Sequence, residues 1–399
     1  MSLIKPLGIQ KIKRLKLGDA FNFNGNNDKN TELFEVKSIK LLTPLDEGSA
    51  NDGKEINKQL GMVYGNNYSF QVTEYMGKKP HDLSKIKWEM IYHDLDDNEW
   101  KELPISNNGD LCTINMSNVD TCGRFVYIRA YINDKKNDAV LKIWKHNRFR
   151  WFDSKKLHSE IEERKRNSWK IDQNDTNTCG PSSIMYVFAK NFKNEYEKFI
   201  SDLHRKGVSQ YNSYNINVND NNNLKKIAET NPNKMGNFPK NMAYADWIPN
   251  ICITAKENKI FDFEGNTKED YQGITLPSRM VKLSKEFLGF NEVIDNTNLF
   301  FNKTGWAWGA TMQDVAELIK ARQDGYQVFL FIGVNMLYNK ITNPAFALPE
   351  HWVVLETIKY DDSGDIELTV YTWGKEPTTK YKLTFDVFRT NYYGNIKIK

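Results

Sequence analysis

The chain has 399 residues, four cysteines and a formal net charge of +4 at pH 7. This length favours two domains, the small net charge argues against a nucleic-acid partner, and so few cysteines exclude a disulfide framework. No apolar run approaches the ~20 residues of a membrane span, and no N-terminal stretch resembles a signal peptide. We therefore expect no integral membrane segment, synthesis in the cytoplasm and, if the protein leaves the cell, export without a cleavable leader.

The first part of the chain has the pattern of a β-domain. Residues 1–32 form a basic segment, and 33–152 contains short runs in which apolar and polar residues alternate, such as Ile86 to Tyr92 and Phe125 to Tyr131. Short strands at this spacing are typical of a small all-β sandwich of immunoglobulin-like type. We expect this domain to act in binding or delivery, with a passive spacer as an equal alternative.

Residues 153–168 have the composition of a charged helical linker. Glu160 and Arg164 stand four residues apart, the spacing at which opposite charges on a helix surface attract each other. The linker separates the β-region from a cysteine motif, and the C-terminal domain, 169–399, follows it.

A reactive-cysteine pattern opens the C-terminal domain. Cys179 and Gly180 precede Pro181, which suits the first turn of a helix, and an apolar helical pattern follows. The unpaired N–H groups and the dipole of a helix N-terminus favour a thiolate, so this position predicts a lowered pKa for Cys179. Gln173, just upstream, is close enough to donate an amide hydrogen bond to a developing oxyanion. The alternative is a buried structural cysteine that starts an ordinary helix.

The pattern Gln-x5-Cys-Gly-Pro-x-Ser resembles that of papain-like cysteine peptidases, especially the bacteriocin leader-processing (double-glycine) peptidases and their relatives. In that group the catalytic histidine comes much later, at the start of a strand, and His351 here leads directly into an apolar, β-branched run. The resemblance implies a domain of the α+β class, with helices first and an antiparallel sheet second. It also implies that His351 is the general base and acid for Cys179.

Three further stretches lie between these motifs. Tyr211 to Asn223 is dense in asparagine, and we expect a loop that is too polar for the core and is a candidate lid. Ile251 to Ile253 has the pattern of a core strand and contains Cys252. Trp306 and Trp308 are either cleft residues or core packing, with core packing favoured.

The last part of the chain has the pattern of one helix followed by antiparallel hairpins. Thr311 and Asp314 have the spacing of a capping box, and Asp361 to Gly364 is a strong turn signal between two apolar runs. We expect a helix at 315–322 and strands at 326–334, 351–360, 366–373, 380–385 and 392–398.

The residue that orients His351 departs from the family pattern. Papain-like enzymes usually have an Asn or Asp on the following strand, where this chain has Tyr371. The register of the hairpin brings the residues just beyond Thr372 opposite His351, so Thr372 and Glu376 both fall within reach. Thr372 is the favoured candidate, and Tyr371, Glu376 and an unassisted Cys–His dyad are the alternatives.

These patterns predict a cysteine hydrolase in which the Cys179 thiolate attacks an amide carbonyl. The expected substrate is a protein or the stem peptide of peptidoglycan, and a deamidase or acyltransferase would use the same residues. By analogy of architecture, the chain is a bacterial secreted effector or toxin, with a secretion apparatus or an immunity protein as partner. The alternative is a non-catalytic binding protein on a degenerate papain-like scaffold. No phosphate-loop or metal-ligand motif is present in the sequence, so we expect no cofactor and no metal.

Overall fold

The computed structural model describes residues 34–135, 139–232, 239, 242–257, 275–297, 310–342 and 349–399. The basic segment 1–32 and both Trp306 and Trp308 lie outside these residues. None of the helices in the described ranges combines the length and the hydropathy that a bilayer crossing requires.

The chain forms two compact units. Of the described residues, the first unit comprises those up to Leu45 together with those within Gly65–Ser117 and Arg124–Lys145, and the second comprises those within Asp46–Tyr64, Asn118–Gly123 and His146–Lys399.

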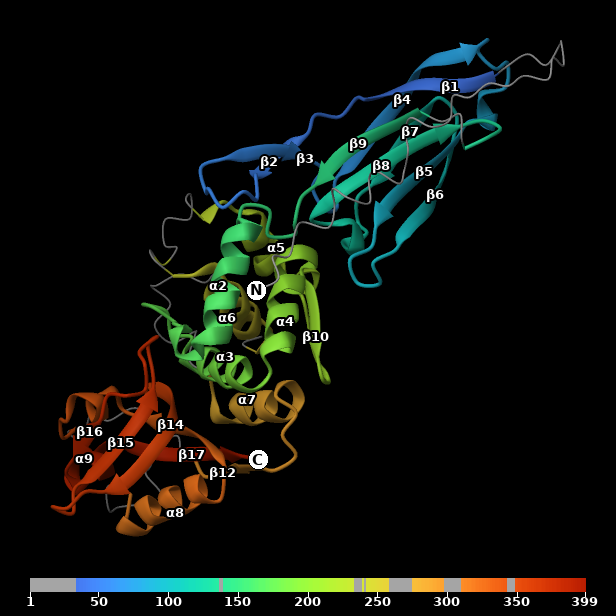
Figure 1. Ribbon diagram of the computed structural model, residues 1–399. Helices are drawn as coiled ribbons and strands as arrows, with labels where there is room; N and C mark the ends of the chain where they lie inside the picture. The colour runs from blue at the N-terminus through green and yellow to red at the C-terminus, as the bar shows by residue number, and fades with distance from the viewer. Residues whose placement is uncertain are drawn as a thin grey trace. The chain divides into compact units, whose positions relative to one another are not determined.

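The first unit consists of two antiparallel β-sheets, drawn in blue to green in Figure 1, with strand orders β1-β4-β7 and β6-β5-β8-β9. Alternate residues of a strand point to opposite faces of its sheet. Phe70 of β4 and Trp88 of β5 are buried with their ring centroids 6.5 Å apart, so the inner faces of the two sheets meet in one core. The strands expected at 86–92 and 125–131 are confirmed as β5 and β8. The strands are β1 (Phe34–Leu41), β4 (Asn67–Gly77), β5 (Lys87–His93), β6 (Trp100–Asn108), β7 (Leu111–Asn115), β8 (Arg124–Tyr131) and β9 (Ala139–Lys145).

The second unit begins with helices and two small hairpins. The helix expected within 153–168 is α2, and its Leu157 and Ile161 are buried in the same core as the helix that starts at Cys179. The α-helices are α2 (Ser154–Arg166), α3 (Cys179–Asn191), α4 (Lys193–Lys206), α5 (Asn222–Glu229), α6 (Tyr244–Glu257) and α7 (Pro277–Lys282), which continues as a π-helical turn, η6 (Leu283–Phe287). The hairpins are β2 (Asp46–Ser49) with β3 (Lys58–Gly61) and β10 (Val208–Tyr211) with β11 (Tyr214–Asn217).

An antiparallel six-stranded sheet completes the second unit, in the order β12-β17-β13-β14-β15-β16 (Figure 1, orange to red). Phe329 and Phe331 of β13 face the core that contains α3 and α6, whereas Val328 and Leu330 face a second core with α8 and α9. Helices therefore cover both faces of the sheet, which explains the unbroken apolar run of β13. The elements are α8 (Met312–Gln323), α9 (Phe385–Asn391), β12 (Val293–Asp295), β13 (Gln327–Ile332), β14 (His351–Tyr360), β15 (Ile366–Tyr371), β16 (Tyr381–Leu383) and β17 (Tyr392–Ile398).

The capping box predicted at Thr311 and Asp314 is confirmed at the start of α8. The predicted hairpin is confirmed as β14 and β15. Mixed helices and antiparallel sheets are compatible with the α+β class.

Two expectations for the second unit are wrong. Cys252 lies in helix α6 and not in a strand, because the apolar residues around it continue a longer helical pattern that packs against α3. The asparagine-rich stretch from Tyr211 contains β11, in which Tyr214 and Ile216 are fully buried. Its alternation of asparagine with apolar residues has the period of a strand, which the high asparagine content concealed.

Candidate active site

Cys179 is the first residue of α3, as Pro181 in the first turn predicts. Only 3% of Cys179 is exposed. Gly180 permits close packing at this helix end, because a Cβ added there would lie 2.5 Å from the side chain of Thr275. The thiol therefore stands at a helix N-terminus that is buried in the described structure.

The sulfur of Cys179 faces the backbone at the start of β14. Its thiol donates a long hydrogen bond to the carbonyl oxygen of Glu350, with Sγ and O 4.0 Å apart. The backbone N–H groups of Trp352, Gly180 and Cys179 itself also lie close enough to the sulfur to lower the thiol pKa by hydrogen bonding. Glu350 and Trp352 are the two neighbours of His351, so the thiol is bound to the backbone on either side of the histidine.

Burial raises the pKa of the Cys179 thiol to about 11, while the three backbone N–H groups lower it. The N–H groups at the helix N-terminus do lower the pKa of the thiol, as expected. Desolvation raises this pKa by more, because burial penalises the charged thiolate. Burial likewise raises the pKa of Cys112 to about 11. The prediction of a lowered pKa for Cys179 is therefore wrong. Cys179 differs from Cys112 in its contacts with the backbone around His351.

His351 is the first residue of β14, and it is buried. Burial lowers the pKa of its imidazole to about 3, so the ring is neutral at physiological pH. Nε2 of His351 lies 2.7 Å from Oγ1 of Thr372, and the ring stacks on Trp373 with centroids 4.5 Å apart and planes at 17°. With Nε2 engaged, Nδ1 is the ring nitrogen left for proton transfer.

A tight turn at the end of β15 brings Thr372 to the imidazole. The backbone N–H of Lys375 donates to the carbonyl of Thr372 at 3.1 Å, and Trp373 and Gly374 both have positive φ, 46° and 62°. A positive φ is unfavourable for a bulky residue, so Trp373 is held in place against His351 at a conformational cost.

The other candidates for the orienting residue lie elsewhere. Glu376 is exposed. The hydroxyl of Tyr371 donates to the backbone carbonyl of Ile171 at 2.7 Å, and its ring stacks on Tyr186 with centroids 3.9 Å apart. Tyr371 therefore fixes the segment that leads to Cys179, while its neighbour Thr372 contacts His351.

Gln173 is buried in that same segment. Its side-chain amide donates to the backbone carbonyl of Thr176 at 2.8 Å, and the Thr176 hydroxyl donates back to the carbonyl of Gln173 at 2.5 Å. In the described part of the chain, no hydrogen bond joins Gln173 to Cys179, so the oxyanion role of Gln173 stays a prediction.

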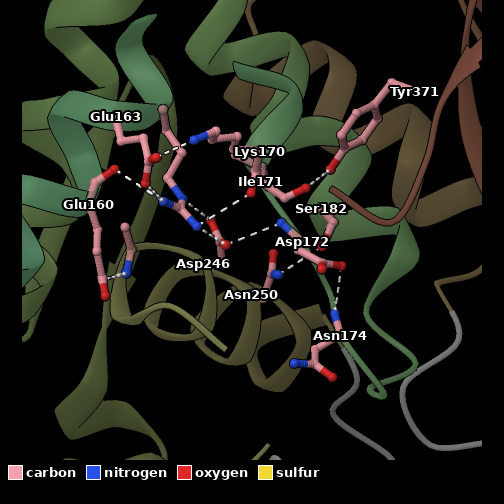
Figure 2. A network of polar contacts seen from close by, with 12 residues as sticks. Glu160, Glu163, Lys170, Ile171, Asp172, Asn174, Ser182, Asp246, Asn250 and Tyr371 are labelled. Atoms are coloured by element: carbon pink, nitrogen blue, oxygen red, sulfur yellow. Dashed lines mark hydrogen bonds and ion pairs between the residues drawn. The ribbon is translucent and has the colours of Figure 1, made fainter. Parts of the chain in front are cut away.

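A buried ion pair contacts the backbone of this segment (Figure 2). The guanidinium of Arg164 on α2 binds the carboxylate of Asp246 on α6 through two bonds of 2.7 Å, and Asp246 also accepts the backbone N–H of Asp172 at 3.1 Å. The i,i+4 spacing predicts that Arg164 pairs with the Glu160 carboxylate. The hydrogen bond from Arg164 to Glu160 instead goes to the backbone carbonyl of that residue. Sequence spacing could not identify Asp246, since it lies 82 positions from Arg164.

Among the described residues, one group has side chains close enough to share a metal ion: His158, Glu162 and Glu197. Lys165 already occupies this position as a cation, with its Nζ 2.6 Å from Glu162 and 2.5 Å from Glu197. The arrangement is therefore explained as an ion-pair cluster on the surfaces of α2 and α4.

The chain matches no known family model, and searches of curated proteins and of solved structures find no significant similarity.

Proposed function

We propose that this protein is a cysteine hydrolase that cleaves an amide bond with Cys179 as nucleophile and His351 as general base and acid. The observation that carries the proposal is the position of the Cys179 sulfur between the backbone of Glu350 and that of Trp352, on either side of His351. The hydroxyl of Thr372 lies 2.7 Å from Nε2 of the same imidazole. A nucleophile, a base and a group that orients the base thus come from three separate segments of the chain.

The charge states favour transfer of the proton during attack over a preformed ion pair. The thiol, with a pKa raised to about 11, is protonated, and the imidazole, with a pKa lowered to about 3, is neutral. Nδ1 of His351 takes the S–H proton as the sulfur–carbon bond forms. The imidazolium then gives this proton to the leaving nitrogen as the carbon–nitrogen bond breaks. Water, deprotonated by His351, then attacks the resulting thioester. As the carbon–sulfur bond breaks, the Cys179 sulfur takes the proton back from the imidazolium and the acid product leaves.

In this mechanism the oxyanion is stabilised by backbone N–H groups at the start of α3. The backbone N–H groups of Cys179 and Gly180 lower the pKa of the thiol, and the dipole of α3 favours negative charge at the same end. We assign a supporting role to Gln173, whose amide has a second N–H beside the one bound to Thr176.

The finer assignments rest on sequence resemblance. We propose a papain-like domain behind an immunoglobulin-like one, in a bacterial secreted effector or toxin that acts on a protein or on the stem peptide of peptidoglycan. A deamidase or an acyltransferase would use the same three residues. A deamidase would attack a side-chain amide in place of the peptide bond, and an acyltransferase would transfer the acyl group to an amine in place of water.

A binding protein on an inactive scaffold is the second candidate. Burial favours it: Cys179, His351 and Thr372 are 3%, 5% and 3% exposed, and both reacting groups are neutral. A substrate reaches this thiol only if the site opens.

Product analysis separates the two candidates. Purified protein is incubated with a proteome-derived peptide mixture and, separately, with peptidoglycan fragments, and the products are identified by mass spectrometry. Hydrolysis that is lost in Cys179→Ala and in His351→Ala, and kept in Cys252→Ala, is expected. Products that persist in Cys179→Ala would show that another group is responsible.

A further inference from the structure

Three consecutive residues just before Gln173 have backbone groups held by side chains from three different elements. Arg164 of α2 donates to the carbonyl of Lys170 at 3.3 Å. Tyr371 of β15 donates to the carbonyl of Ile171 at 2.7 Å, and Asp246 of α6 accepts the N–H of Asp172 at 3.1 Å. Each of these three residues is therefore held by a side-chain contact that is buried or partly buried (Figure 2).

Helix α6 also holds the chain on the other side of the nucleophile. Asn250 lies one turn after Asp246, on the same face of α6, and its side-chain amide donates to the hydroxyl of Ser182 at 2.8 Å. Ser182 is in the first turn of α3. Asp246 and Asn250 thus hold Asp172 and Ser182, and Cys179 lies between those two positions in the chain.

We propose that Asp246 and Asn250 are positioning residues that set the place of Cys179 relative to His351, with Arg164 holding the Asp246 carboxylate. The inference rests on the proposed function. We call Asp246 and Asn250 of α6, together with Arg164 of α2, the α6 clamp. None of them contacts the sulfur, so they act through the backbone and the first turn of α3.

The chemistry of the clamp favours positioning over stability. A buried ion pair stabilises a fold little better than apolar residues of similar size, because both charges lose their hydration. It does, however, fix geometry, since the bidentate guanidinium–carboxylate contact has one preferred arrangement. Asp246 is 1% exposed and Asn250 is 1% exposed, so water does not compete for these contacts.

The test measures the coupling between Cys179 and His351 and not activity alone. For each variant, the rate of iodoacetamide labelling at Cys179 is measured with His351 present and again with His351→Ala. The first rate divided by the second is the His351-dependent acceleration, called the quotient. Loss of stability by itself changes both rates together, whereas misplacement of the thiol lowers the quotient.

Two clamp variants and one control are compared. Asn250→Ala removes the contact to Ser182, and the double variant Arg164→Met with Asp246→Leu removes the ion pair without leaving an unpaired buried charge. The control is Thr254→Val, on the next turn of α6, because the buried Thr254 hydroxyl has no hydrogen-bond partner among the described residues. Circular dichroism and protection of the Cys252 thiol show that each variant is folded.

The clamp predicts that the quotient falls about tenfold or more toward unity in both clamp variants, because a shift of about 1 Å at a reacting pair costs on the order of 10²-fold in rate. The control keeps the wild-type quotient. An unchanged quotient in a folded clamp variant overturns the positioning role and leaves the proposed function standing. If the double variant does not fold, Asn250→Ala provides the test of the positioning role. A quotient of one in the wild-type protein overturns the proposed function itself, and the clamp with it.

Discussion

The hydroxyl of Thr372 lies 2.7 Å from Nε2 of His351, although β15 has already ended at Tyr371. The turn that follows, with positive φ at Trp373 and Gly374, directs the chain back toward the start of β14. In the proposed mechanism this contact orients the imidazole and leaves Nδ1 for proton transfer.

Replacement of Thr372 with valine removes this hydrogen bond and keeps the shape of the side chain. We expect the His351-dependent labelling of Cys179 to fall roughly tenfold, since general-base catalysis needs an oriented base. The matched variant Thr372→Ser retains a hydroxyl and should keep most of the rate. Equal rates in the valine and serine variants would exclude an orienting role for Thr372.

Trp373→Ala should raise the pKa of His351. The stacked indole covers the imidazole, and burial is what lowers this pKa to about 3. Removal of the indole admits water, so the pKa moves up toward its ordinary value of about 6.5. NMR titration of the imidazole measures the shift, with Trp247→Phe on α6 as a control at a distant buried tryptophan. A pKa that stays near 3 in Trp373→Ala would contradict this explanation.

Acid should destabilise the second unit through His204. Burial lowers the pKa of this imidazole to about 4, and Nε2–H donates to the carbonyl of Phe152 at 2.8 Å. Between about pH 6.5 and about pH 4 the unfolded chain therefore binds a proton that the folded chain does not, and stability falls by about 1.4 kcal/mol per pH unit as the pH decreases.

His204→Gln removes this titration while it keeps an amide donor for Phe152. Urea unfolding across the same pH range should give a shallower pH dependence, reduced by about one proton. The same slope in the variant and in the wild-type protein would show that His204 titrates normally in the folded state.

Glu160 should have the opposite pH dependence. Burial raises the pKa of its carboxyl to about 7, against the lowering effect of the Ala245 N–H that donates to it at 3.1 Å. The folded state therefore holds this proton more tightly than the unfolded state, and the associated stability is lost as the pH rises from about 4.5 through about 7.

Glu160→Gln keeps an acceptor for the Ala245 amide and cannot ionise. We expect this variant to be about 1–2 kcal/mol more stable than the wild-type protein at about pH 8 and nearly equal to it at about pH 5. Urea unfolding at the two pH values checks this. A variant that is less stable at the higher pH would show that the Glu160 charge is net favourable.

Local patterns in the sequence were sufficient for much of the secondary structure. The capping box at Thr311, the helix start at Cys179 and the turn after Tyr360 each depend on neighbouring residues, and the structure has all three. The errors at Cys252 and in the stretch from Tyr211 arose where composition was weighed above periodicity.

The contacts that shape the site were less accessible to sequence reasoning. The order of Cys179 and His351 indicates a pair, and the hairpin register predicts Thr372 near the imidazole, where the structure has it. The orienting role of Thr372 stays a prediction. The pairing of Arg164 with Asp246 depends on tertiary packing, and so does the burial that moves both pKa values away from an ion pair. Neither effect has a signature in local sequence.

The most direct test of the Cys–His pair is iodoacetamide labelling of the native protein from about pH 5 to about pH 9, with site assignment by mass spectrometry, in wild type and His351→Ala. Because His351 remains neutral above its lowered pKa of about 3, Cys179 should label faster in the wild-type protein by a nearly constant factor across this range, with Cys252 as the internal reference. Equal Cys179 rates in the two proteins at every pH would contradict the assignment of His351 as the base.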